Sequence, residues 1–113
     1  MAGLTISTQQ SADVTIVQLG GSASMGEIDA FSRQTDRLAA ARPKRLVLDL
    51  SGLDFLASLA IGQLVALSKA VKLHGGKVSL AAPKPEVLAV LNRCNLSAIL
   101  PVFTTLDEAL AAG

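Results

Sequence analysis

The stretch "LVLDLSGLDFLASLAIGQLVAL", Leu46–Leu67, combines two patterns that decide the fold. It opens with a nearly continuous apolar run, which together with the preceding Arg45 forms "RLVLDL" (Arg45–Leu50). Such a run predicts a central strand in a sheet covered on both faces. "SGLDF" then reads as a loop. The second half predicts a helix from about Ser58 to His74, with a buried stripe at Ile61, Leu64, Val65, Ser68 and Val71. A lone hydroxyl, Ser58, thus lies where a strand gives way to a helix.

Outside this stretch, strands and helices follow one another in a simple order. Leu4–Thr8 and Val14–Leu19 predict an opening β-hairpin that ends at Gly20-Gly21. Further strands are expected at Lys77–Ala82 and, at a sheet edge that tolerates Pro101, at Ile99–Phe103. Two early strands followed by strand–helix alternation predict an α/β fold with a mixed sheet of four to five strands. The 113 residues fit a single domain, 1–113.

Local signals set the expected ends of the helices. Ser24 and Glu27 have the spacing of a capping box and predict a helix start, and Thr105 and Glu108 predict another. Pro85 fits the first turn of a helix. The Gly75-Gly76 pair predicts a left-handed C-terminal cap. Arg42-Pro43 should end the first helix, because a residue before proline avoids the α region.

Composition excludes several classes of function. The net charge is +1, from 10 basic and 9 acidic residues, and only 3% of the residues are aromatic, so a nucleic-acid binder is not expected. "MAGLTISTQQ" lacks a secretory pattern, and the most apolar window, "FLASLAIGQLVALSKAV", falls short of the ~20 residues that span a bilayer. The lone Cys94 suits a reducing compartment and is expected to be a small buried hydrophobe. We therefore expect a cytoplasmic protein without membrane insertion.

Enzyme and metal chemistry find little support. Ser58 lacks the glycines of a nucleophile elbow, and the one histidine, His74, lies about 24 Å away along the same predicted helix at ~1.5 Å per residue. One His and one Cys do not supply a zinc site. Asp49 and Asp54 could pair or hold a hard cation, but the simpler interpretation is two acids satisfied by nearby amides. No phosphate-binding glycine loop is present. The sequence predicts no catalytic residue, metal or cofactor.

Ser58 has two interpretations that share one geometry. As a structural residue it would be the N-cap of its helix, which is worth ~1 kcal/mol. As a functional residue it would be a phosphorylation site, because a phosphate is well accommodated at a helix N-terminus. A phosphate would add roughly two negative charges to a surface bordered by Leu56, Leu59 and Ile61. It would thereby block a partner that docks there.

"RLVLDLSGLDFLASLAIGQLVAL" resembles the signature of STAS domains, and of the anti-sigma factor antagonist family in particular. That signature is an apolar strand ending in Asp-Leu-Ser, a short loop, and Asp-Ser-Ser/Thr-Gly-Leu-Gly opening a helix. "GGS" after the second strand, "HGGKVSLAAPKPEVLAVL" and "FTTLDEAL" extend the resemblance over nearly the whole chain. It implies a STAS-type fold with helices packed mainly on one face of the sheet.

The resemblance also implies a partner switch. In such antagonists the serine after the motif aspartate is phosphorylated by an anti-sigma factor that is itself a serine kinase of the histidine-kinase-like ATPase type, and a serine phosphatase reverses the modification. The matching serine is Ser58. In this sequence Ala57, Leu59 and Ala60 replace the motif Asp, hydroxyl residue and Gly, whereas Gly62 remains. The expected partner-binding residues are Asp49, Asp54, Leu56, Ala57, Ser58, Leu59 and Ile61.

Ala57 and Leu59 also favour an alternative within the same family. The chain would then be a non-phosphorylated STAS adaptor, either a subunit of a transporter ATPase complex or a scaffold in stress signalling. Binding of a small molecule is a third possibility, for which the sequence offers no pocket chemistry.

Overall fold

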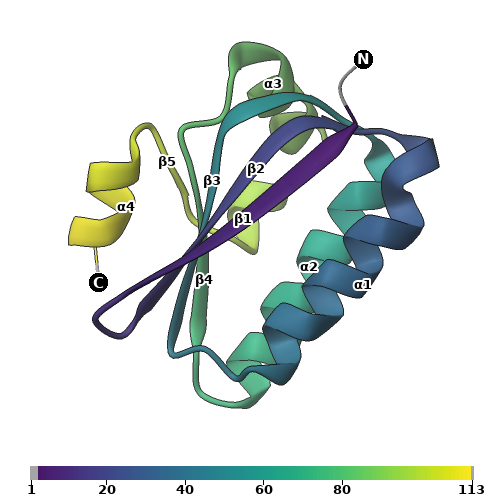
Figure 1. The fold of residues 1–113 in the computed structure, drawn as a ribbon. Helices are drawn as coiled ribbons and strands as arrows, with labels where there is room; N and C mark the ends of the chain where they lie inside the picture. The colour runs from purple at the N-terminus through teal and green to yellow at the C-terminus, as the bar shows by residue number, and fades with distance from the viewer. Residues whose placement is uncertain (1–2, 113) are drawn as a thin grey trace.

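The computed structural model describes residues 3–112, which form one sheet with helices on both of its faces (Figure 1). Each predicted strand and helix has a counterpart in the structure. In chain order the elements are β1 (Leu4–Ser11), β2 (Val14–Ala23), the 3-10 turn η1 (Met25–Glu27), α1 (Ile28–Ala40), β3 (Arg45–Leu56), α2 (Ser58–Leu73), β4 (Lys77–Ala81), α3 (Pro85–Arg93), the 3-10 turn η2 (Leu96–Ala98), β5 (Val102–Phe103) and α4 (Leu106–Ala111).

The five strands lie in the order β1-β2-β3-β4-β5. β1 and β2 form an antiparallel hairpin, and every other neighbouring pair is parallel. A helix connects each parallel pair, as the crossover between parallel strands requires. The predicted mixed sheet, with β3 at its centre, is confirmed.

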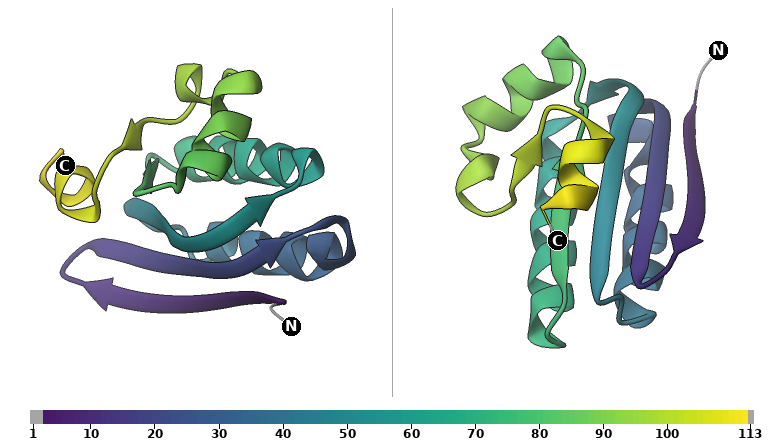
Figure 2. Two further views of the ribbon diagram at one scale, coloured as in Figure 1. Left: turned by 90° about the horizontal axis from the view of Figure 1, so that it is seen from above. Right: turned by 90° about the vertical axis from the view of Figure 1, so that its left-hand side faces the viewer.

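Alternate residues of the strands divide the apolar side chains between two cores. The larger core lies between the sheet and the helices α1, α2 and α3, and includes Leu48 and Leu50 of β3. The smaller core lies under α4 and includes Val47 of β3. Figure 2 shows α4 alone on its face of the sheet. The expectation that helices pack mainly on one face is therefore confirmed.

Three strands are longer than predicted. β1 continues past Thr8 to Ser11, so the hairpin turn is shorter than expected. β2 continues past Gly20 and Gly21 to Ala23, and "SGLDF" continues β3 to Leu56 instead of forming a loop. β2 and β3 stay paired because register shifts absorb their irregularities. Gly20 does not end a strand: a Cβ there would lie 2.7 Å from Thr5 Oγ1, so glycine permits close packing against β1.

The predicted ends of α2 and α4 are confirmed. Gly75 has a φ of +83°, and the amides of Gly75 and Gly76 donate to the carbonyls of Lys72 and Val71, both at 2.9 Å. This is a Schellman motif. At the start of α4, Thr105 Oγ1 accepts a hydrogen bond from the Glu108 amide at 3.1 Å.

Two local predictions are wrong. The side chain of Ser24 makes no capping hydrogen bond, and the chain first forms η1, so that α1 begins only at Ile28. Cys94 is exposed rather than buried, because it is the C-cap of α3, where the chain leaves the core. A pattern of residue types near a helix end does not determine which side chains face the core.

Candidate functional site

Ser58 is the first residue of α2, and its side chain is exposed. The N-cap is Ala57, and no side chain caps the helix, so the interpretation of Ser58 as the N-cap is wrong. Its hydroxyl therefore has no capping role in the fold.

Ala57 is the N-cap because the sheet holds it in an extended conformation. Its φ and ψ are −71° and 151°, and its amide donates to the carbonyl of Ala23, at the end of β2, at 2.9 Å. The Ala57 carbonyl then accepts from the Ala60 amide at 2.9 Å and begins the helix. No acidic residue lies in the first turn, so the positive end of the helix dipole faces solvent beside Ser58 without a compensating side chain.

Three large apolar side chains are exposed on the elements that meet at the end of the molecule where α2 begins. Met25 of η1 is 64% exposed, Phe55 of β3 is 51% exposed and Leu59 of α2 is 55% exposed. The Ala57–Ala23 hydrogen bond joins the ends of β2 and β3, which brings η1 and the start of α2 to the same end of the molecule (Figure 1). We call Met25, Phe55 and Leu59 the apolar rim.

Sequence reasoning found Leu59 but missed the other two rim residues. The sequence pattern places Phe55 in the loop "SGLDF" and Met25 in the first turn of the helix expected to start at Ser24. The available signal is a pair of large apolar residues, each between the end of a predicted strand and the apolar stripe of the helix that follows. That signal becomes informative only when the strands are known to extend this far.

Three of the predicted partner-binding residues lie in the core. Leu56, Ala57 and Ile61 are all buried beneath the helix start. The prediction that Leu56 and Ile61 border an exposed surface is wrong, because both side chains join the larger core. These three residues pack in the core and do not present side chains to a partner.

The two candidate acids have different surroundings. Asp49 is buried, and its Oδ1 accepts the Ser51 amide at 3.0 Å, as the simpler interpretation of a strand-end acid predicts. It lines a polar groove of about 300 Å³ with Thr5 and Gln18. Asp54 is exposed and forms an ion pair with Lys84, the N-cap of α3, instead of bonding to an amide. The two carboxylates therefore have different partners and do not form a pair.

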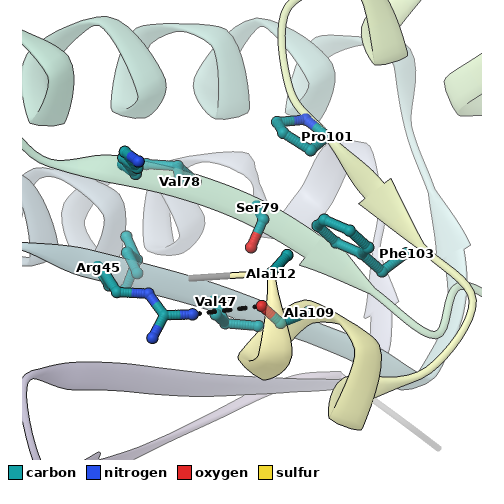
Figure 3. A pocket seen from close by; sticks show the side chains of 10 residues that line it. Arg45, Val47, Val78, Ser79, Pro101, Phe103, Ala109 and Ala112 are labelled. Carbon is teal, nitrogen blue, oxygen red and sulfur yellow. Dashed lines mark hydrogen bonds between the residues drawn. The ribbon is translucent and has the colours of Figure 1, made fainter.

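A pocket of about 200 Å³ lies on the other face, between α4 and the sheet (Figure 3). Arg45 lies at its edge, and its Nη2 donates to the carbonyls of Ala109 and Leu110 at 3.3 and 2.9 Å. The guanidinium thereby neutralises the negative C-terminal end of α4. The polar contacts of this pocket hold the helix to the sheet.

The family is shown by comparison with known proteins. The STAS domain profile matches residues 5–109. The anti-sigma-F factor antagonist RsfA of Mycobacterium tuberculosis is 33% identical over 94 residues, which cover 77% of this chain and 73% of RsfA.

Solved structures agree with the fold. An anti-sigma factor antagonist from Mycobacterium paratuberculosis superposes with a TM-score of 0.89 at 26% identity, over 97% of this chain and 93% of that one. The Bacillus cell fate determinant SpoIIAA in its phosphorylated form gives a TM-score of 0.70 at 14% identity, over 96% and 98% of the chains, which shows the fold alone.

Within residues 3–112, none of the helices has the length and apolar character needed to cross a bilayer. The long apolar helix α2 packs its buried side chains against the sheet instead. From the matched profile, the relatives and the shared architecture, this chain belongs to the STAS domain family.

Proposed function

We propose that this protein is an anti-sigma factor antagonist that docks the start of α2 onto an anti-sigma factor in the cytoplasm. One observation carries the proposal: Ser58 is exposed at a helix start that no side chain caps, at the same end of the molecule as the apolar rim. The relatives named as anti-sigma factor antagonists support the same class of partner.

The apolar rim supplies the driving force for docking. Large apolar side chains gathered at one end of a small protein are a common mark of a protein-binding surface. Burial of this surface contributes roughly 25 cal/mol per Å². Aromatic residues and Met are enriched at interfaces, which suits Phe55 and Met25 as anchors.

Ser58 is the control point of this docking. The partner is proposed to be an anti-sigma factor that is also a serine kinase of the histidine-kinase-like ATPase type, and it transfers a phosphoryl group to the Ser58 hydroxyl. In the free protein the phosphate benefits from the N-terminal end of α2. In the complex about two negative charges would lie among apolar side chains, so phosphorylation favours release. A serine phosphatase then restores the docking form.

The departures from the family signature fit this surface. Leu59 stands where the family has a small hydroxyl residue, and it adds exposed apolar area beside Ser58. Ala57 stands where the family has Asp, and as the N-cap it leaves the first amides of α2 without a side-chain acceptor. A phosphate on Ser58 would thus meet no neighbouring carboxylate in the first turn.

The test is affinity capture from a lysate of the organism that encodes the chain, with four baits. Wild type and Ser58→Ala are expected to capture an anti-sigma factor with an ATPase domain, identified by mass spectrometry. Ser58→Glu should lose it, whereas the neutral, similarly sized Ser58→Gln should retain most of the binding. If Ser58→Glu binds as well as Ser58→Gln, charge at this position does not control docking.

The kinase step has its own measurement. Incubation of the captured partner with ATP and wild type should place a phosphate on Ser58, as located by peptide mass spectrometry. The alternative is a non-phosphorylated adaptor in a transporter ATPase complex or a stress-signalling scaffold, which Ala57 and Leu59 favour. It predicts equal capture by all four baits and no phosphate at Ser58.

A further inference from the structure

The outer edge of β1 is open along its whole length. Among residues 3–112, β1 pairs with β2 on one side only, and Figures 1 and 2 show no other helix or strand of this range beside its free edge. An open edge presents unpaired amides and carbonyls that another strand can use. The edge is eight residues long, from Leu4 to Ser11.

The opposite edge of the sheet is protected. β5 has only two residues, Val102 and Phe103, and Pro101 precedes it. Short edge strands and proline are recognised devices against unwanted pairing. β1 has none of them: no charged residue or proline occurs from Gly3 to Ala12, and its register with β2 has no shift.

The register of the hairpin identifies the backbone groups that face outward. The Ser22 amide donates to the Gly3 carbonyl at 3.3 Å, so Gly3 directs its hydrogen-bonding groups toward β2. These groups alternate in direction along an antiparallel strand. The residues whose amides and carbonyls point away from β2 are therefore Leu4, Ile6, Thr8 and Gln10.

We propose that β1 pairs antiparallel with β1 of a second copy of this chain and continues the sheet across a two-fold axis. The register that uses all four outward-facing residues pairs Ile6 with Thr8 of the other copy, and Leu4 with Gln10. It places Ser7 on the axis, opposite itself. An interface between two identical copies must be self-complementary in this way.

Charges along α1 favour a second copy as the partner. Glu27, at the start of this helix, lies beside the beginning of β1, because a Cβ on Gly3 would be 3.6 Å from Glu27 Oε1. Near the end of β1, basic residues from α1 and the following loop line a hollow of about 570 Å³ beside Thr8 and Gln10. They are Arg37, Arg42 and Lys44, and Asp13 is the one acidic residue that lines the same hollow.

A two-fold axis through Ser7 runs the two α1 helices antiparallel on the same face of the joined sheet. The acidic start of each helix then faces the basic end of the other, and this arrangement is complementary. A partner strand from an unrelated protein would not supply this match. The two helix starts at Ser58 would point to opposite ends of the dimer and both remain accessible, so the inference does not depend on the proposed function.

The first experiment is sedimentation equilibrium of the purified chain between about 1 µM and about 1 mM, which spans weak association. We expect a monomer–dimer equilibrium that added salt weakens.

Thr8→Pro removes one outward amide and should give a monomer, whereas Thr8→Val keeps that amide and should dimerise like wild type. Thr8→Lys is a second test, in case Thr8→Pro does not fold. It keeps the amide but adds a charge to the edge, so it should dimerise less than wild type. A monomer at all concentrations, or a dimer unaffected by Thr8→Pro and Thr8→Lys, overturns the proposal.

The second experiment tests the register. In a Cys94→Ser background, Ser7→Cys places two thiols opposite each other across a non-hydrogen-bonded pair, at a Cα separation of about 4.5 Å that permits a disulfide. Mild oxidation should cross-link it. Gln9→Cys is the matched control, because Gln9 faces Thr5 of the other copy and its own counterpart is too distant. Cross-linking of Gln9→Cys in preference to Ser7→Cys contradicts the proposed pairing.

Discussion

Ala57 occupies the position at the start of α2 where a side-chain oxygen could accept a hydrogen bond from the first turn. Alanine has no side-chain oxygen to make this bond, and Ser58 is already the first residue of the helix and not its N-cap. We expect Ala57→Ser to raise the free energy of unfolding by about 1 kcal/mol, because a serine N-cap satisfies a free amide. Ser58→Ala should change it by less than about 0.5 kcal/mol, as for other exposed positions. Urea unfolding measures both, and a loss of about 1 kcal/mol in Ser58→Ala would restore its role as a cap.

Gly62 has no structural reason to be glycine. It lies inside α2, one turn beyond Ser58, its φ is not in the left-handed region, and a Cβ there would meet nothing within 4 Å. Gly62→Ala should therefore stabilise the protein by about 0.5–1 kcal/mol, as measured by urea unfolding. If a partner approaches the exposed surface of α2 closely, the same change should weaken capture of that partner. Unchanged capture would remove Gly62 from the docking surface.

At the scale of the element, the turn between α2 and β4 is tightly constrained at both of its glycines. A Cβ on Gly76 would lie 2.3 Å from the Pro43 carbonyl oxygen and 2.6 Å from Val71 Cγ1, so backbone must move to admit it. Gly75 has a φ of +83° but open space around it. We expect Gly75→Ala to cost about 1–2 kcal/mol of stability, from its backbone conformation alone. Gly76→Ala should cost more, about 3 kcal/mol or above, in the same thermal or urea measurements. The reverse order would mean that backbone conformation outweighs close packing at this turn.

Elements with local causes could be predicted from the sequence. The Gly75-Gly76 cap, the proline at the start of α3 and the Thr105 cap each depend on residues within one turn of one another, and all three are confirmed. The extensions of β2 and β3 could not be predicted, because they depend on pairing between residues more than thirty positions apart. Ser24 shows the same limit: its spacing to Glu27 fits a cap, but the chain turns through η1 first.

The candidate site also has a part that could be predicted from the sequence and a part that could not. Its location at the start of α2 follows from the signature around Ser58, which the family match supports. Which apolar residues are exposed there does not follow from the signature, because burial depends on the neighbours that the sheet brings together. Leu56 and Ile61 face the core, whereas Phe55 and Met25 face solvent.

At the scale of the whole molecule, packing and docking use different side chains. The larger core joins β2, β3 and β4 to three helices, and its residues are buried almost completely. The apolar rim lies at one end, outside that core. The open edge of β1 lies elsewhere, along one side of the sheet. Stability, partner docking and self-association should therefore respond to different substitutions.

The sharpest test of this separation compares two leucines on α2. Leu64 is 1% exposed, so Leu64→Ala should lower the free energy of unfolding by about 2–5 kcal/mol. Leu59 is 55% exposed, so Leu59→Ala should leave that free energy within about 0.5 kcal/mol of wild type while reducing capture of the partner. Urea unfolding and the capture assay on the same two proteins measure both effects. Full capture by Leu59→Ala would show that the apolar rim does not contact the partner, even if Ser58 proves to be phosphorylated. A large loss of stability in Leu59→Ala would instead mean that this side chain packs against the protein in solution, and the start of α2 would then offer less apolar surface for docking.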